Sequence, residues 1–73
     1  MPIIFITKTP NSFEKILRAT SRINEKHDLK LDGAKCEVAI NSRKLHGVRI
    51  KGIDRYTEIG LIQQYFQDAG FEF

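Results

Sequence analysis

The side chains that could carry covalent chemistry in this sequence are one cysteine and two histidines, Cys36, His27 and His46. A cysteine nucleophile needs a histidine within hydrogen-bond reach to accept its proton. Cys36 and His46 fall in two segments of alternating apolar and polar residues, which predict a β-hairpin. In its register His46 lies four residues along the strand from Cys36, or roughly 13 Å at about 3.3 Å per residue. Cys36 is therefore interpreted as a small buried hydrophobic residue and each histidine as structural or without a role, and no catalytic residue is assigned.

The same three residues do not form a metal-binding pattern. A zinc site needs closely spaced ligands, and the sequence has no Cys-x-x-Cys or His-x-x-x-His spacing. It also has no Gly-rich phosphate loop, and its acidic residues are dispersed. We therefore expect a protein without metal or cofactor that is not an enzyme.

The basic residues remain as candidates, and they are unevenly distributed. Residues 1–51 hold eleven of the twelve Lys and Arg but only five of the nine Asp and Glu, whereas residues 52–73 carry an excess of three negative charges. Such segregation makes one side of a small protein cationic, which suits nucleic acid or an acidic protein partner. The alternative is that a net charge of +3 only keeps the domain in solution.

Residues 11–27 predict an amphipathic helix that carries a row of these cations. The apolar face consists of Phe13, Ile16, Leu17, Thr20, Ile23 and His27. At about 100° per residue, the opposite face carries a row of four basic residues, Lys15, Arg18, Arg22 and Lys26. Such a row is either a solvated helix surface or a phosphate-binding surface.

Two N-terminal caps fit this helix. Asn11 with Glu14 three residues later would form a capping box, or Thr9 would cap with Pro10 as the first helical residue. After the helix, Asp32-Gly33 is expected to form the turn of the connector at residues 28–34.

Residues 35–41 and 45–51 alternate between apolar and polar, which predicts an antiparallel hairpin. A three-residue loop at residues 42–44 would place Val38 opposite Val48. In this register one face of the hairpin collects the side chains that should contact the helices, which are Cys36, Val38, Ile40, Val48 and Ile50.

The remaining elements complete one small domain over residues 1–73. The apolar run at residues 3–8 predicts a central strand, and a second helix is expected from an Asp54 cap to Ala69, ended by Gly70. Whether residues 71–73 add a last strand stays open. The predicted class is α+β, a single antiparallel-type sheet with two helices on one face in the order β-α-β-β-α(-β), with a ferredoxin-like arrangement as one candidate.

The sheet face away from the helices is a second candidate binding surface. Phe5 would lie there beside Arg49 and Lys51, an arrangement that can stack a base and hold phosphate. In its first-strand aromatic the pattern resembles an RNA-recognition motif, but it departs from that family at residues 45–50, where the third-strand aromatics are absent. Arg43 and Lys44 extend the positive field in the hairpin loop.

Together these observations favour a small non-catalytic regulatory protein that binds RNA or DNA. The candidate binding residues are Lys15, Arg18, Arg22, Lys26, Arg43, Lys44, Arg49, Lys51 and Phe5. The alternative is a protein-binding inhibitor or adaptor that acts through a sheet edge or apolar face, with a homodimer also open. In size alone the chain resembles phage or plasmid regulators. A single cysteine and the lack of a long apolar run predict a cytoplasmic protein without a membrane partner.

Overall fold

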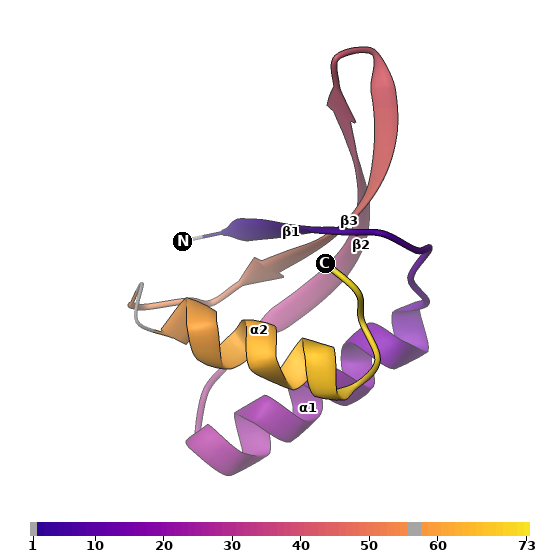
Figure 1. Ribbon diagram of the computed structural model, residues 1–73. Helices are drawn as coiled ribbons and strands as arrows, with labels where there is room; N and C mark the ends of the chain where they lie inside the picture. The colour runs from indigo at the N-terminus through magenta and orange to yellow at the C-terminus, as the bar shows by residue number, and fades with distance from the viewer. Residues whose placement is uncertain (1, 56–57) are drawn as a thin grey trace.

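The computed structural model describes residues 2–55 and 58–73, in which three strands and two helices follow one another (Figure 1). The elements in chain order are β1 (Ile3–Thr7), α1 (Phe13–His27), β2 (Asp32–Ile40), β3 (Arg43–Lys51) and α2 (Glu58–Asp68). The strands form an antiparallel sheet in the order β1-β3-β2, and both helices lie on the same side of it. The predicted α+β class, with an antiparallel sheet and two helices, is confirmed.

The prediction that β1 is the central strand is wrong, because β3 lies between β1 and β2. Ile3 and Phe5 pair with the fully buried residues of β3 and face the helices, whereas Ile4 and Ile6 face the opposite side and are 49% and 37% exposed. A continuous apolar run is typical of a strand buried on both faces. Here the second face is instead left uncovered by the described part of the chain.

Both predicted caps of α1 are replaced by Ser12, whose hydroxyl oxygen accepts a hydrogen bond from the backbone N–H of Lys15 at 3.2 Å. Asn11 is buried and donates its side-chain N–H to the carbonyl oxygen of Gly47 at 3.2 Å. The helix ends at Asp28, which adopts a left-handed conformation. The turn therefore lies at Asp28 and not at the predicted Asp32-Gly33, which begins β2.

The hairpin is present, but its loop and register differ from the prediction. The turn has two residues, Asn41 and Ser42, both with positive φ (51° and 64°), as in the type I′ turns that match strand twist. Ile40 is consequently opposite Arg43, and Val38 is opposite Leu45 instead of Val48. Relative to the predicted register, each partner on β3 is displaced by three positions, and an odd displacement exchanges the two faces of a strand.

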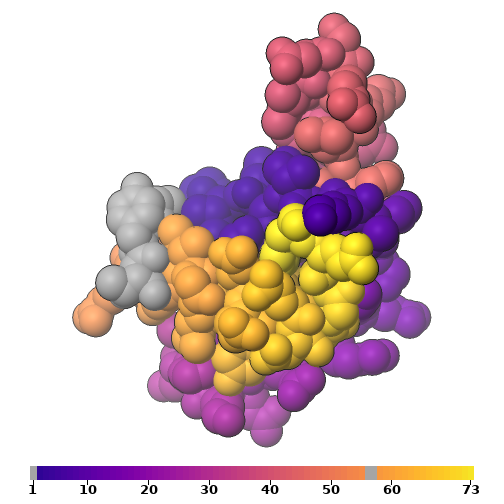
Figure 2. Space-filling view, viewed as in Figure 1, coloured from indigo at the N-terminus to yellow at the C-terminus, as the bar shows by residue number. Residues whose placement is uncertain are grey.

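The new register divides the predicted core face of the hairpin. Val48 and Ile50 are fully buried against the helices, as predicted. Cys36, Val38 and Ile40 lie on the side of the sheet away from the helices, which we call the open face, so their predicted contact with the helices is wrong. The distal half of the hairpin extends beyond the body of the molecule (Figure 2).

Helix α2 begins later than predicted. Its first described helical residue is Glu58, Asp54 and Arg55 are not helical, and residues 56–57 of the predicted helix lie outside the described residues. Gly70 ends the helix as predicted, with φ +95°. The N–H of Phe71 donates to the carbonyl of Phe66 at 3.0 Å, and that of Gly70 to Gln67 at 3.0 Å, which is a Schellman motif.

The C-terminal residues form no strand, but they do meet β1. The N–H of Lys8 donates to the carbonyl of Glu72 at 2.8 Å, so the end of the chain runs beside β1 (Figure 1). This single backbone bond is weaker than a paired strand, and the final strand left open by the sequence is not formed.

The core lies between the sheet and the helix layer. Its fully buried large residues come from both helices, from β3 and from the segment after it, and they are Ile16, Ile23, Val48, Ile50, Ile53, Ile62 and Phe66. Phe66 also stacks edge to face on Phe71, with ring centroids 4.9 Å apart. Neither described helix has the length and apolar character needed to cross a bilayer.

Candidate nucleic-acid interface

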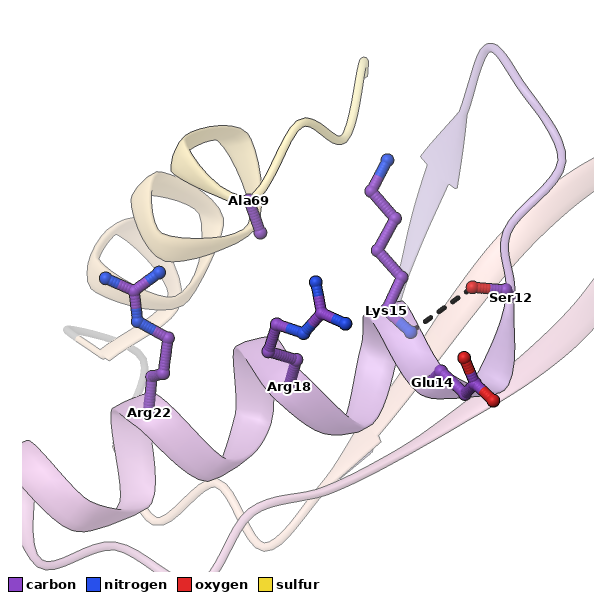
Figure 3. Close-up of a pocket in the computed structure, with 6 residues that line it drawn as sticks. All are labelled: Ser12, Glu14, Lys15, Arg18, Arg22 and Ala69. Carbon is purple, nitrogen blue, oxygen red and sulfur yellow. Dashed lines mark hydrogen bonds between the residues drawn. The ribbon is translucent and has the colours of Figure 1, made fainter.

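We call the row of basic residues on α1 the α1 ridge; its members are Lys15, Arg18, Arg22 and Lys26. Figure 3 shows Lys15, Arg18 and Arg22 extending from the side of α1 that faces α2. Arg18 and Arg22 are exposed and line an open hollow between the helices, together with Ser12, Glu14, Lys15 and Ala69. Arg22 also lines a neighbouring hollow with Glu25, Lys26 and Tyr65. The two hollows therefore meet at Arg22 and form one shallow surface over the helix layer.

Lys15 differs from the other members of the ridge because it is already engaged. Its ammonium group donates to the carbonyl oxygen of Gly70 at 3.2 Å and lies 4.8 Å from the centre of the Phe71 ring. These contacts tie Lys15 to the residues that follow α2, through one hydrogen bond and one cation–π interaction. Lys15 thus connects the two helices, and Arg18, Arg22 and Lys26 remain as the available cations.

The available cations have no ion-pair partner within the described residues, although Glu14 and Glu25 are near in sequence. Successive residues Arg18, Arg22 and Lys26 are one helical turn apart, or about 6 Å along the axis. Three exposed positive charges in a row repel one another, and a bound anion would relieve that repulsion.

Phe5 does not belong to a binding surface, and its assignment to the open face is wrong. Its ring packs in the core, 6.3 Å from the ring of Phe66 and 5.3 Å from that of Phe73. The cause is the pairing of Phe5 with Val48, which faces the helices. Arg49 and Lys51 do lie on the open face, but without an aromatic neighbour for stacking a base.

The nine predicted binding residues are therefore not one site. Arg43 and Lys44 sit beside the hairpin turn, Arg49 and Lys51 lie on the open face, and the α1 ridge lies on the other side of the sheet. Among these nine residues only the members of the ridge form a continuous row, and two hollows lie beside them.

The open face is mainly aliphatic, which the sequence-based register did not show. On this face Arg49 of β3 lies between Ile4 of β1 and Ala34 of β2. In the same way Gly47 lies between Ile6 and Cys36. Toward the hairpin turn the apolar surface continues through Val38, Leu45 and Ile40, the last of which is 45% exposed. The sequence signal for an apolar open face is that residues 3–6 are all apolar, so both sides of that strand carry apolar side chains.

The residues considered for catalysis are also distributed over different surfaces. Cys36 lies opposite Gly47 on the open face, whereas His46 lies opposite Glu37 and faces the other side. His27 is hydrogen-bonded through its Nε2 to the hydroxyl group of Tyr65 at 3.0 Å. In residues 2–55 and 58–73, no three potential metal ligands come together.

Comparison with known proteins adds no relative: no family model matches the chain, and no curated protein or solved structure matches it significantly.

Proposed function

We propose that the protein is a small non-catalytic regulatory protein of the cytoplasm that binds nucleic acid through the α1 ridge. The observation that carries the proposal is the row of three exposed cations, Arg18, Arg22 and Lys26, which have no ion-pair partner in the described chain. Lys and Arg that neutralise phosphates release counterions, and this release drives sequence-independent binding.

The dimensions of the ridge suit a phosphate backbone. Arg18 and Lys26 are eight residues apart, which is about 12 Å along a helix. One strand of B-DNA presents a phosphate about every 3.4 Å along its axis, so about three phosphates face this length. The hollows on either side of Arg22 leave room for the guanidinium group to turn toward an oxygen.

The mode of binding that follows is contact with the backbone and not with the bases. The open face offers aliphatic side chains around Arg49 and Lys51, and Phe5 is committed to the core. Stacking of unpaired bases on the sheet, which would add about 1–3 kcal/mol per base, is therefore not part of the proposal. We expect affinity to vary little with nucleotide sequence.

We also infer a ferredoxin-like plan, of which the described residues supply the first three strands and both helices. β1 and β2 run parallel with β3 between them, which is the split β-α-β arrangement. The bond from Lys8 to Glu72 supports this inference, because it brings the C-terminal chain to the side of β1 where a fourth strand would pair. Extension of the C-terminus by several β-branched residues should lengthen this pairing, as measured by amide hydrogen exchange in β1.

The test is a salt titration of binding to single- and double-stranded oligonucleotides of mixed sequence. The double variant Arg18→Glu/Arg22→Glu should lower affinity at least tenfold at low salt and flatten the salt dependence by about two phosphate contacts. The matched control Arg43→Glu/Lys44→Glu makes the same charge change at the hairpin turn and should have a smaller effect. Arg49→Ala/Lys51→Ala tests the open face in the same way.

Two outcomes would contradict the proposal. Equal losses in the ridge variant and the hairpin control would mean that only total charge matters. No binding by the unmodified protein at low salt would favour the alternative, a protein-binding inhibitor or adaptor of phage or plasmid type, whose affinity depends on a few central anchors.

A further inference from the structure

The two outer strands of the sheet differ in what lies along their free edges. β1 meets the C-terminal chain through the bond from Lys8 to Glu72. β2 spans nine residues, and within the described chain its only strand neighbour is β3. A free edge of this length, without proline, is a template for adding another strand.

The two-residue turn determines which backbone groups point to that edge. Ile40 and Arg43 flank the turn and form the first hydrogen-bonded pair of the hairpin. Because hydrogen-bonding pairs alternate, Cys36 also directs its N–H and C=O toward β3. Lys35 and Glu37 direct theirs toward the free edge, and the side chains of both are exposed.

We propose that this edge pairs antiparallel with the same edge of a second copy, about a two-fold axis at Cys36. The two three-stranded sheets then become one continuous sheet. Lys35 of each copy lies opposite Glu37 of the other, and these residues exchange the backbone hydrogen bonds that the free edge lacks. The contact is isologous, as in most homodimers.

Charge complementarity selects this register from its neighbours. An axis at Lys35 would place two lysines opposite each other, and an axis at Glu37 would oppose two glutamates. Like charges directly opposite destabilise a strand pair, whereas opposite charges contribute roughly 0.2–1 kcal/mol per pair. With the axis at Cys36, both symmetry-related Lys–Glu pairs are favourable.

Beside the charged side chains of the edge, the flank of α1 carries two exposed apolar side chains where the second copy would approach. α1 lies over β2, since a Cβ added to Gly33 would be 2.7 Å from Cγ2 of Ile16. Phe13 and Leu17 project from the flank of α1 away from α2 and are 63% and 50% exposed. A two-fold axis perpendicular to the sheet brings this flank against its copy and covers these side chains.

The open side of the edge provides a built-in reporter. On that side Cys36 faces Cys36 of the other copy, and Ala34 faces Val38. The two cysteines form a non-hydrogen-bonded pair, for which Cα atoms are about 4.5 Å apart, within the range that a disulfide spans. Cys36 is the only cysteine in the chain, so any covalent dimer must form through it.

The first measurement is the mass in solution by sedimentation equilibrium, without nucleic acid. The proposal expects a dimer of twice the 8.4 kDa chain at micromolar concentration. Lys35→Glu should raise the dimer dissociation constant on the order of tenfold or more, because both Lys–Glu pairs become repulsive. The charge-swapped double variant Lys35→Glu/Glu37→Lys should restore the dimer, and circular dichroism should show the same fold in all three.

The second measurement is cross-linking by diamide, which takes two electrons and two protons from a pair of thiols to leave one disulfide. The unmodified protein should cross-link efficiently, Lys35→Glu poorly, and the charge-swapped variant efficiently again. In the control Cys36→Ser/Gln67→Cys, the thiol lies at an exposed position of α2, away from the β2 edge, and should cross-link poorly.

A monomer at several hundred micromolar would overturn the proposal, as would a dimer whose affinity is unchanged in Lys35→Glu. Neither result bears on the nucleic-acid proposal, because the α1 ridge is present in a single copy and dimerisation is measured without a ligand.

Discussion

The ring of Phe5 on β1 lies against the ring of Phe66 on α2, with centroids 6.3 Å apart and planes tilted by 43°. Phe66 is fully buried, and Phe73 closes over Phe5 from the C-terminal tail at 5.3 Å. This contact joins the first strand to the last helix and the chain end. It also explains why the aromatic residue of β1 is absent from the open face.

Phe5→Ala should therefore reduce stability and not ligand contacts. Loss of the ring leaves a cavity beside Phe66 and should lower the free energy of unfolding by about 3 kcal/mol, measured by urea denaturation. Ile6→Ala is the matched control on the open face and should cost less, because Ile6 is already 37% exposed. If Phe5→Ala instead kept its stability and lost nucleic-acid binding, the core assignment would be wrong.

Ser42→Gly should stabilise the protein by about 1 kcal/mol. Ser42 occupies the second position of the turn with φ 64°, where glycine has no steric penalty and Asn-Gly is the preferred pair. Thermal unfolding of Ser42→Gly beside Ser42→Ala measures the effect, since alanine keeps the left-handed strain. A three-residue loop at residues 42–44 would predict no gain specific to glycine at this position.

Asn24→Ala should destabilise the connection between α1 and β2. The side chain of Asn24 accepts a hydrogen bond from the N–H of Leu31 and donates one to its carbonyl, each at 2.9 Å. Removal leaves both backbone groups of a buried residue without that partner, which costs about 1–3 kcal/mol. Asn24→Asp keeps the acceptor and should lose less; equal losses in denaturation experiments would argue against the paired contact.

Gly60→Ala and Gly70→Ala should have opposite effects. Gly60 lies within α2, and a Cβ there would meet nothing within 4 Å, so alanine should raise stability by about 0.5–1 kcal/mol through helix propensity. Gly70 has φ +95°, a conformation in which alanine is strained. Gly70→Ala should therefore lower stability by about 1 kcal/mol or more. Differential scanning calorimetry of both variants checks the pair; a loss in Gly60→Ala would indicate an unseen close contact.

The elements that the sequence predicted well are those whose signals are local. The helical period from Phe13 to His27 requires only the 3.6-residue repeat, and Gly70 ends α2 because few other residues tolerate a left-handed conformation. The two hairpin strands follow from their alternation. The position of the α1 ridge on an exposed helix side follows from the same repeat.

The start of α1 was less predictable because several residues could cap it. Thr9, Asn11 and Ser12 all have suitable side chains, and the choice depends on what else each can bind. Asn11 reaches Gly47 on β3, thirty-six positions along the chain, which leaves Ser12 as the cap.

The sequence by itself determined the amphipathic α1, the presence of a hairpin and the α+β class, because each depends on residues near one another in the chain. Tertiary structure decided which side of each strand is covered. Residues 3–6 are apolar at every position, and residues 35–51 alternate equally well with a two- or a three-residue loop, so neither pattern distinguishes the faces. The covered side is determined by the pairing of Phe5 with Val48, because the Phe5 ring then packs against Phe66. Ile4, Ile6 and Cys36 consequently lie on the open face.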